Sequence, residues 1–316
     1  MMLMDSIDTH FSNFIELRKS LGYRHGRWHV GSELSDYFTR NYPDETAITK
    51  RMFDAWLEQR EFKTNSNHAH IVTNARTFLR YLRFVGEDVF IPGDDYSVNV
   101  PRYTPYIFTD DELTRLFNAF DSIPASNASP KREYIIPVLF RMMYCCGMRP
   151  GEPLSILKQD IDLNSGEIYI RQAKGYKDRR ILISDDLLEL CRKYAGLMPT
   201  EKYFFERILG ERISTEWAGD QFILAWSLSG LPKRGHPRPY DLRHNFAARL
   251  IIRWVNEGKE VLELMPFLSA YLGHMDLDST LYYVHLVPER LFKNKGIDWQ
   301  RFKSIYSEAD NGKAKS

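Results

Sequence analysis

Apolar residues recur at helical spacing through most of the chain, and the first block of this pattern runs from Asp5 to about Gly86. Two stretches within it, FSNFIELRKSL and TNARTFLRYLRFVG, repeat apolar positions near a period of 3.6 residues. Such stripes are typical of amphipathic helices that bury one face against each other. We therefore expect a bundle of three or four helices at the start of the chain.

The periodicity is interrupted by the stretch DDYSVNVPRYTPYIFT, which contains two prolines and several polar residues. Proline removes a backbone donor and fixes φ, so this composition is typical of a linker. We expect four parts: a helical domain at 1–95, a linker at 96–108, a second domain at 109–290 and a terminal segment at 291–316.

The second domain is expected to begin with a helix, because Thr109 and Glu112 have capping-box spacing before an apolar-periodic run. The acidic residues Asp110, Asp111 and Glu112 would then complement the positive end of the helix dipole. A metal site at this triplet is the less favoured alternative.

Further along, the pattern predicts helices and one β-hairpin. The stretch GEIYIRQAKGYKDRRILIS contains two strand-like runs, Ile168–Arg171 and Arg180–Ile183, around a turn. Helices are expected at 131–146, 185–197, 215–228, 240–255 and 260–272. The predicted fold class is therefore mainly α: an N-terminal helical bundle followed by a mostly helical domain with a small β-hairpin.

Composition adds limits on the class of protein. The 316 residues are 43% hydrophobic and 27% charged, and no apolar run is long enough to span a membrane. The first residues do not resemble a secretory signal, so we expect a cytoplasmic protein with no membrane partner. The three cysteines lack metal-ligand spacing and are expected to be free, buried thiols.

Charge is distributed in local clusters. The formal net charge is +1, with 12 Lys+Arg against 14 Asp+Glu in residues 1–100. Binding to DNA would therefore depend on clusters such as RKSLGYRHGRWH rather than on a global field. The candidate phosphate contacts in this cluster are Arg18, Lys19, Arg24 and Arg27. A solvated helix end is the equally weighted alternative.

Several polar residues of the second domain have an ordinary explanation when taken singly. Arg149 follows an apolar helix and could pair with Glu152, and Arg243 could be an intrahelical ion-pair partner. Lys174 lies in the predicted hairpin turn, where lysine is usually solvated. His274 follows a Leu-Gly helix end, where histidine can cap the last carbonyls.

Their order along the chain is more informative than any one of them. The motifs GMRPGE, AKGYK, YDLRH, LGH and YVH follow one another in the second domain. This series resembles the catalytic domain of the tyrosine recombinases, the family of phage integrases and Xer-like proteins. The resemblance implies a SAM-like, core-binding helical domain in residues 1–95 and a recombinase catalytic domain in residues 109–290.

The resemblance assigns the nucleophile to Tyr283, which lies nine residues after His274 and two before His285. Tyr282 is out of register by one residue, about 100 degrees around a helix, so only one of the two rings would face a phosphate. We interpret Tyr282 as a packing residue.

The remaining motif residues fit phosphoryl transfer. Planar guanidinium groups bind phosphate oxygens bidentately, which suits Arg149 and Arg243. The resemblance gives Lys174 the role of proton donor to the departing 5′ oxygen, with Lys177 as the alternate, and His274 that of a hydrogen-bond donor to the phosphate. These groups supply the electrostatics, so no metal, ATP or other cofactor is expected.

One position departs from the family pattern. Tyr240 stands where the pattern has the first histidine of His-x-x-Arg. A phenol with a pKa near 10 can hydrogen-bond a phosphate but is a poor base at neutral pH. His236 is a possible substitute upstream, and His244 is expected to pack or to orient its neighbours.

The expected partner is double-stranded DNA carrying specific recombination sites, held between the two domains, with salt-sensitive phosphate contacts. The segment GIDWQRFKSIYSEA has an apolar stripe: Trp299, Phe302, Ile305 and Tyr306. This stripe packs either within its own chain or, as the resemblance implies, on a neighbouring subunit of a homotetramer on paired sites.

The sequence thus predicts a site-specific recombinase that acts through a 3′-phosphotyrosyl intermediate, in integration, excision or transposition of a mobile element. Two alternatives remain open at this point. One is a DNA-binding accessory protein without catalysis, which Tyr240 alone favours. The other is a nicking and closing enzyme similar to the type IB topoisomerases.

Overall fold

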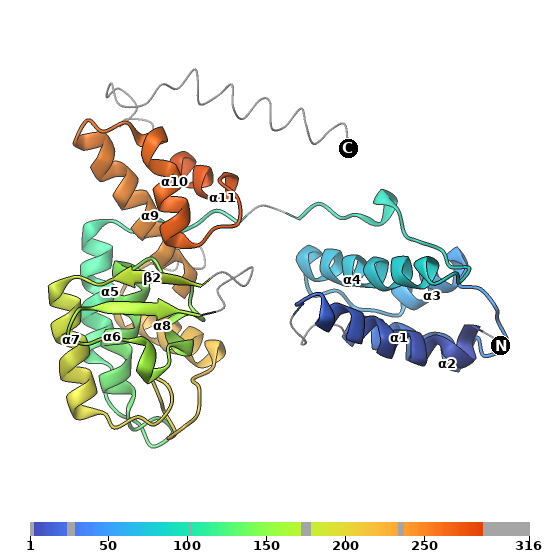
Figure 1. Cartoon of the computed structure of the whole chain (residues 1–316), viewed down its shortest axis with the longest axis horizontal. Helices are drawn as coiled ribbons and strands as arrows, with labels where there is room; N and C mark the ends of the chain where they lie inside the picture. Colours follow the sequence, from blue (N-terminus) through green and yellow to red (C-terminus); the bar gives the residue numbers. More distant parts are fainter. Residues whose placement is uncertain (1–2, 24–28, 101–102, 172–177, 233–236, 287–316) are drawn as a thin grey trace. The chain divides into compact units, whose positions relative to one another are not determined.

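The computed structural model divides the chain into two compact units, Met1–Tyr103 and Thr104–Ser316 (Figure 1). It describes residues 3–23, 29–100, 103–171, 178–232 and 237–286. Each unit has its own hydrophobic core, and each is described by itself below.

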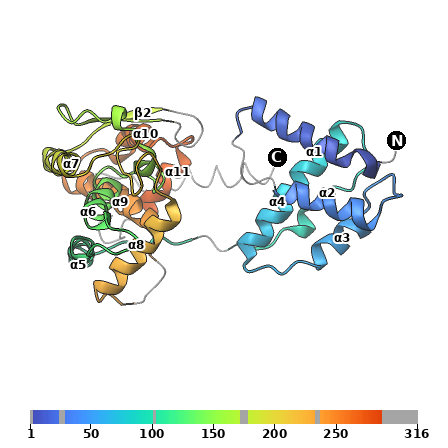
Figure 2. The same ribbon diagram turned by 90° about the horizontal axis from the view of Figure 1, so that it is seen from below.

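The first unit is a bundle of four helices, α1 (Leu3–Ser20), α2 (His29–Asn41), α3 (Lys50–Glu58) and α4 (Asn65–Phe84) (Figure 2). Its helices bury stripes at the spacing predicted from the sequence; on α2 these are Val30, Leu34 and Phe38. Thr49 and Thr64 cap α3 and α4 by accepting hydrogen bonds from backbone N–H groups three residues on. The mainly α class predicted for this part is confirmed.

The two ends of the predicted linker pack in different units. Tyr96, in a short 3-10 helix (Asp94–Tyr96), lies edge-on to Phe53 of the first core, with ring centroids 5.3 Å apart. Tyr106 and Phe108 instead pack near Trp226 of the second unit. Asn245 anchors this second end by hydrogen bonds to the backbone of Tyr106 and Phe108. The chain therefore becomes part of the second core before the predicted domain start at residue 109.

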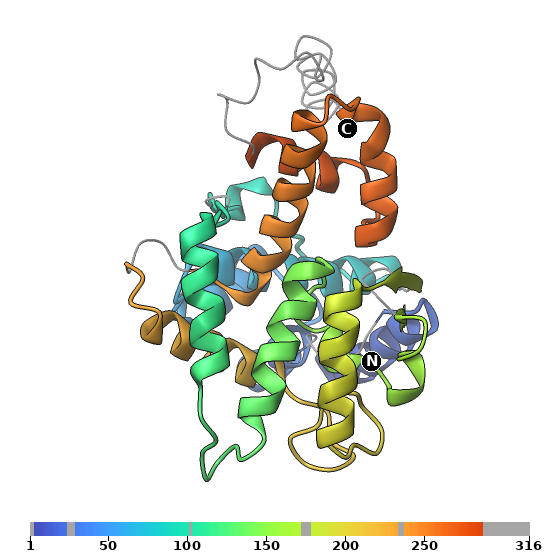
Figure 3. The same cartoon turned by 90° about the vertical axis from the view of Figure 1, so that its left-hand side faces the viewer.

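The second unit begins with α5 (Asp110–Ser122), whose capping box forms as predicted: Thr109 accepts from the N–H of Glu112, and Glu112 accepts from the N–H of Thr109. Next come α6 (Arg132–Cys145) and α7 (Asp185–Leu197), and α5, α6 and α7 lie side by side (Figure 3). The unit continues with α8 (Thr215–Leu228), α9 (Pro239–Asn256), α10 (Val261–Leu272), α11 (Asp278–Leu281) and a 3-10 turn (Tyr282–Leu286).

The predicted hairpin is present as an antiparallel pair of strands, β1 (Glu167–Ile170) and β2 (Arg179–Leu182). Both strands begin and end one residue earlier than the sequence suggested. Ile168 pairs with Ile181, and both are buried. Because side chains alternate along a strand, Arg179 shares the core-facing side with Ile181, while Arg180 points to the other side.

Two further expectations from the sequence concern membrane-spanning helices and the burial of the cysteines. No described helix is both long and apolar enough to cross a membrane. The expectation that all three cysteines are buried is wrong for Cys145, which is exposed, whereas Cys146 and Cys191 are buried. Cys145 lies in the last turn of α6, on the wall of a cavity of about 710 Å³, where the helix face turns from the core to the surface.

Candidate active site

Arg149 and Arg243 come together from different elements of the second unit. Arg149 follows α6, and its Nη2 donates to the carbonyl of Gly273 at 2.8 Å. Arg243 lies one turn into α9; its Nη1 donates to the carbonyl of Gly147 and its Nη2 to that of Leu272, both at 2.8 Å. The side chain of Arg243 is fully buried, so backbone carbonyls fix its guanidinium in place.

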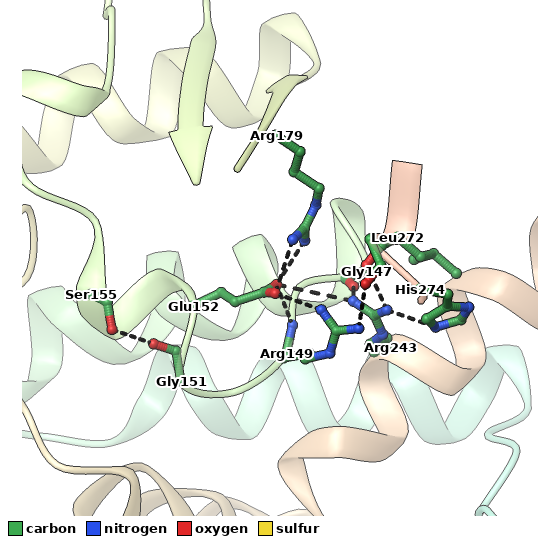
Figure 4. A network of polar contacts seen from close by, with 10 residues as sticks. Gly147, Arg149, Gly151, Glu152, Ser155, Arg179, Arg243, Leu272 and His274 are labelled. Carbon is green, nitrogen blue, oxygen red and sulfur yellow. Dashed lines mark hydrogen bonds and ion pairs between the residues drawn. The ribbon is translucent and has the colours of Figure 1, made fainter. Parts of the chain in front are cut away.

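Glu152 is the carboxylate that this cluster surrounds (Figure 4). It accepts from the backbone N–H of Arg149 at 2.8 Å and from Nη1 of Arg149 at 2.9 Å. Arg179 binds it bidentately, at 2.9 and 2.7 Å, and Nη1 of Arg243 is 4.0 Å away. Burial tends to raise the pKa of Glu152, but hydrogen bonds and charge from Arg179, together with the charge of Arg243, outweigh it and lower that pKa.

Two glycines supply carbonyls to the arginines because their backbones are left-handed. Gly147 has φ 58° and Gly273, the C-cap of α10, has φ 65°. Glycine adopts such angles without steric cost. A Cβ on Gly147 would lie 2.4 Å from the ring of Phe246, and one on Gly273 would lie 3.1 Å from Nη1 of Arg179. Both positions therefore favour glycine for conformation; Gly147 also requires it for space, whereas a Cβ on Gly273 would press on the side chain of Arg179.

The guanidinium groups of Arg149 and Arg243 are called the clamp. His274 lies between the clamp and α11. Its Nε2 is 2.9 Å from Nη2 of Arg243, which has only protons to offer, so Nε2 accepts. Its Nδ1 therefore carries the proton and donates to Oγ1 of Thr280 at 2.6 Å. Burial, with the charges of Arg243 and Arg149, lowers the pKa of His274 to about 3. The ring is thus neutral, and both of its nitrogens are engaged by protein groups. Its expected hydrogen bond to a phosphate stays a prediction.

Tyr283 lies against this cluster. The ring is 2% exposed, stacks on His274 with centroids 5.9 Å apart, and lies 5.5 Å from the ring of His244. Burial raises the pKa of Tyr283, and the charge and hydrogen bonding of Arg243 offset this only in part. Its neighbour Tyr282 is only partly buried.

Tyr240 and His244 complete the described part of the site from one face of α9. Their rings are 5.0 Å apart, and the charge of Arg243, on the same helix, acts to lower the pKa of Tyr283. Burial and the charge of Arg243 lower the pKa of His244 to about 4, so this ring is also neutral near pH 7. Within the described ranges, no three His, Cys, Asp or Glu side chains gather in a way that would hold a metal ion.

The structure does not describe every residue that the sequence predicted for the site or for DNA binding. Lys174, Lys177, His236, Arg24 and Arg27 fall outside the described residues, as does the aromatic stripe after residue 286.

The other two predicted DNA contacts, Arg18 and Lys19, belong to the last turn of α1 in the first unit. The guanidinium of Arg18 lies 3.4 Å from the ring centroid of Tyr23, and Lys19 pairs with Glu16 at 2.6 Å.

Arg179 and Thr280 are the contacts that sequence reasoning missed. Arg179 alternates with Ile181 along β2, and this period of two was the signal that its side chain faces inward. Thr280 gave no comparable signal, because its role depends on the chain reversal between α10 and α11 that brings its hydroxyl to His274.

Residues 107–290 match the model of the phage integrase family. The chain belongs to that family. Membership of the phage integrase family supports a role in site-specific recombination and confirms the family predicted from the sequence. Tyrosine recombinase XerC of Vibrio cholerae is 26% identical over 89% of this chain and 89% of its own length.

Solved structures show the same fold as this integrase-family chain. XerH bound to its palindromic difH substrate, a post-cleavage complex, has a TM-score of 0.61 at 19% identity, covering 83% of this chain and 76% of that one. A lambda integrase tetramer bound to a Holliday junction has a TM-score of 0.59 at 18% identity, covering 85% and 77%. The mostly helical fold with a small antiparallel sheet agrees with these neighbours.

Proposed function

We propose that this protein is a site-specific DNA recombinase in which Tyr283 attacks a DNA phosphate and forms a covalent 3′-phosphotyrosyl intermediate. The observation that carries the proposal is the position of the Tyr283 phenol, which is buried within electrostatic reach of Arg243 and Arg149. A nucleophile next to two guanidinium groups matches the needs of a phosphate carrying extra negative charge in the transition state.

In this reaction the bond between Oη of Tyr283 and phosphorus forms as the bond from phosphorus to the 5′ oxygen breaks. The phenol releases its proton to solvent water as it attacks, and Lys174 is assigned the role of donating a proton to the departing 5′ oxygen. Neutral Tyr240 would hydrogen-bond the phosphate. A 5′ hydroxyl of a second strand then reverses the attack and rejoins the DNA, so that no outside energy source is consumed.

His274 is proposed to act through Arg243. Its Nε2 accepts from Arg243, and its Nδ1 is held by Thr280, so the ring fixes the guanidinium in the orientation that a phosphate would meet. Contact between His274 and the phosphate would require this hydrogen bond to exchange.

We further propose that the protein acts on double-stranded DNA with paired recombination sites, as a homotetramer, in the movement of a mobile element. XerH is seen with its difH substrate and lambda integrase as a tetramer on a Holliday junction, which supports this assembly for a chain of the same fold. Sedimentation with a duplex that carries two sites should show four protomers per two sites. One protomer per duplex would contradict the tetramer.

The covalent step is tested with a pool of nicked duplexes whose half-sites are randomised. After cleavage next to the nick, the short strand diffuses away, so religation is prevented and the covalent adduct accumulates. The native protein should form a denaturant-resistant adduct, and Tyr283→Phe should abolish it. Tyr282→Phe is the matched control and should retain it. An adduct that survives in Tyr283→Phe, or none with the native protein, would overturn the proposal and favour a DNA-binding protein without catalysis.

The clamp is tested with the same duplexes. Arg149→Ala and Arg243→Ala should each lower the cleavage rate by about 100-fold or more, because one preorganised donor contributes about 3 kcal/mol. Rates within about threefold of the native value would place the phosphate elsewhere. Relaxation of supercoiled plasmids lacking any selected site would indicate a nicking and closing enzyme instead.

A further inference from the structure

Arg179 reaches the clamp from strand β2 but is not placed to contact DNA. Its two terminal nitrogens bind the two oxygens of Glu152 at 2.9 and 2.7 Å. The side chains of Arg179 and Glu152 are only 9% and 8% exposed. Because both nitrogens are engaged by the carboxylate, we treat Arg179 as acting on a bound phosphate through its neighbours, chiefly Glu152.

The ion pair between Arg179 and Glu152 determines the net charge of the cluster. Arg149, Arg179 and Arg243 carry three positive charges and Glu152 carries one negative charge, while His274 is neutral near pH 7. The cluster therefore has a net charge of about +2. Without Arg179, the same carboxylate would cancel half of the charge of the two clamp arginines.

We propose that Arg179 is a positioning residue whose charge offsets Glu152, so that Arg149 and Arg243 present two uncompensated positive charges to the reacting phosphate. This inference rests on the proposed function and adds a residue to it. A phosphodiester carries one negative charge, and attack by Tyr283 adds nearly one more to its non-bridging oxygens. A site with net charge +2 stabilises that change better than a site with net charge +1.

Arg179 also lies next to a backbone group that orients Arg149. Its guanidinium packs against Gly273, whose carbonyl accepts the hydrogen bond from Nη2 of Arg149. Arg179 thus lies next to both groups that orient Arg149, the carboxylate of Glu152 and the C-cap of α10.

Arg180 provides a matched control on the same strand. Its side chain is 69% exposed and pairs with Glu167 at 2.9 Å on the outer face of the hairpin. Arg179→Gln and Arg180→Gln therefore remove the same charge from adjacent residues, but only the first removes it from the cluster. Arg179→Lys keeps the charge while losing the bidentate geometry.

The readout is single-turnover release of the 5′-hydroxyl strand from a nicked duplex selected with the native protein. Two versions are compared, one with the natural scissile phosphate and one with a neutral methylphosphonate at that position. The transition state of the neutral substrate carries about one negative charge instead of two, so its rate, measured from free protein and free DNA, depends less on the charge of the clamp. The ratio of the two rates reports the electrostatics of the site, whereas loss of folded protein lowers both rates equally.

Arg179→Gln should slow cleavage of the phosphodiester about 30-fold and that of the methylphosphonate about threefold or less. Arg180→Gln should match the native protein on both, and Arg179→Lys should keep the native ratio. Adding Glu152→Gln to Arg179→Gln removes the uncompensated carboxylate and should restore phosphodiester cleavage about tenfold. Circular dichroism at the assay temperature verifies that each variant is folded.

An unchanged ratio in folded Arg179→Gln, or a double variant slower than the single one on the phosphodiester, would overturn the assignment. If Arg179→Gln does not fold, a ratio in Arg179→Lys that falls by tenfold would overturn it as well. If the native protein cleaves neither substrate, the proposed function itself fails. If the native protein cleaves DNA but the rate ratio does not depend on Arg179, only the assignment of Arg179 fails.

Discussion

Tyr240 brings a neutral hydroxyl to a place where the family pattern has histidine. Its ring lies 5.0 Å from His244. A charged imidazole at this position would lower the pKa of Tyr283, which a neutral phenol does not do. The described site therefore lacks a polar side chain that titrates near neutrality, because His244 and His274 have pKa values of about 4 and 3. The phenol can bind a phosphate, but proton transfer must come from elsewhere.

Tyr240→His should retain or raise the rate of covalent adduct formation, because an imidazole with a pKa near 6.5 both donates to a phosphate and accepts a proton at neutral pH. Adduct yield on nicked duplexes checks this. Tyr240→Phe is the control and should be slower than the native protein, since it lacks the hydroxyl. Complete inactivity of Tyr240→His would show that the phenol has a role of its own.

At the level of residues, the sequence identified the polar side chains of the cluster by their order but not their partners. Arg149 and Glu152 are three residues apart, and their pairing was one of the interpretations considered. The contacts of Arg243 with the carbonyls of Gly147 and Leu272 join residues 96 and 29 positions apart. Such contacts depend on how α6, α9 and α10 pack, which local patterns do not encode.

The end of α10 shows how a single helix terminus can organise the site. Gly273 stops the helix in a left-handed conformation, presents its carbonyl to Arg149 and leaves space for Arg179. Gly258, just after α9, has a similar φ of 69° but no atoms within 4 Å of the place a Cβ would occupy. The two glycines therefore separate the effect of backbone strain from the effect of a steric clash.

Gly258→Ala should lower the free energy of unfolding by about 1 kcal/mol, the usual cost of a left-handed non-glycine residue. Gly273→Ala should cost about 1 kcal/mol more and should also slow cleavage, because its methyl group displaces Arg179. Urea unfolding and adduct formation measure the two effects. Equal stabilities and equal rates for the two variants would show that the contact with Arg179 does not matter.

The segment between α7 and α8 is held by Glu206, a fully buried carboxylate. It accepts from the backbone N–H groups of Glu201, Lys202, Tyr203 and Gly210 at 2.7–3.0 Å. Burial tends to raise the pKa of Glu206, but these hydrogen bonds outweigh it and lower that pKa. Nothing in its sequence context distinguishes this glutamate from the other charged residues around it.

Glu206→Gln should lower the free energy of unfolding by about 2 kcal/mol, because an amide oxygen replaces a charge that four donors bind and the new NH₂ group lacks an acceptor. Glu211→Gln is the matched control: the residue is exposed in the same segment and should change stability by less than about 0.5 kcal/mol. Chemical denaturation measures both. A difference below that limit would show that the segment contributes little to stability.

For the whole molecule, periodicity predicted the helical bundle, the hairpin and most helices of the second unit. Thr215–Leu228 and Asp185–Leu197 have the expected bounds, since apolar spacing defines both helices and Ser214 caps the first of them. The one-residue shift of the strands reflects pairing between two chain segments. Tyr106 and Phe108 join the second core because Asn245, far along the chain, binds their backbone, and that contact has no local signature.

Acid should weaken the second unit between about pH 6.5 and pH 4 because of His244, which is buried, and His274, which is half-buried. In the folded state the pKa values of His244 and His274 are about 4 and 3, whereas in the unfolded chain both lie near 6.5. The unfolded state therefore binds more protons in this range, and stability falls as pH falls. The loss should be about 1 kcal/mol per histidine at about pH 5.5.

Urea unfolding across this pH range tests the prediction, and His274→Gln should remove about half of the pH dependence. Glu152 and Glu206 have lowered pKa values, so their contributions are lost only below about pH 4.5 and fall outside this range. A free energy of unfolding that stays constant between about pH 7 and pH 5 would mean that these histidines have the same pKa in the folded and the unfolded protein.

The burial of Tyr283 and Arg243 has a consequence for selectivity. The phenol is 2% exposed and the guanidinium is not exposed at all, so no phosphate reaches either group while the surrounding side chains stay in place. If the protein acts as proposed, a duplex that merely associates with its surface would stay intact, because surface binding alone does not rearrange the interior. Only DNA that binds an opened arrangement more tightly than the closed one would be cut, so the site of binding and the site of strand cleavage would be selected separately.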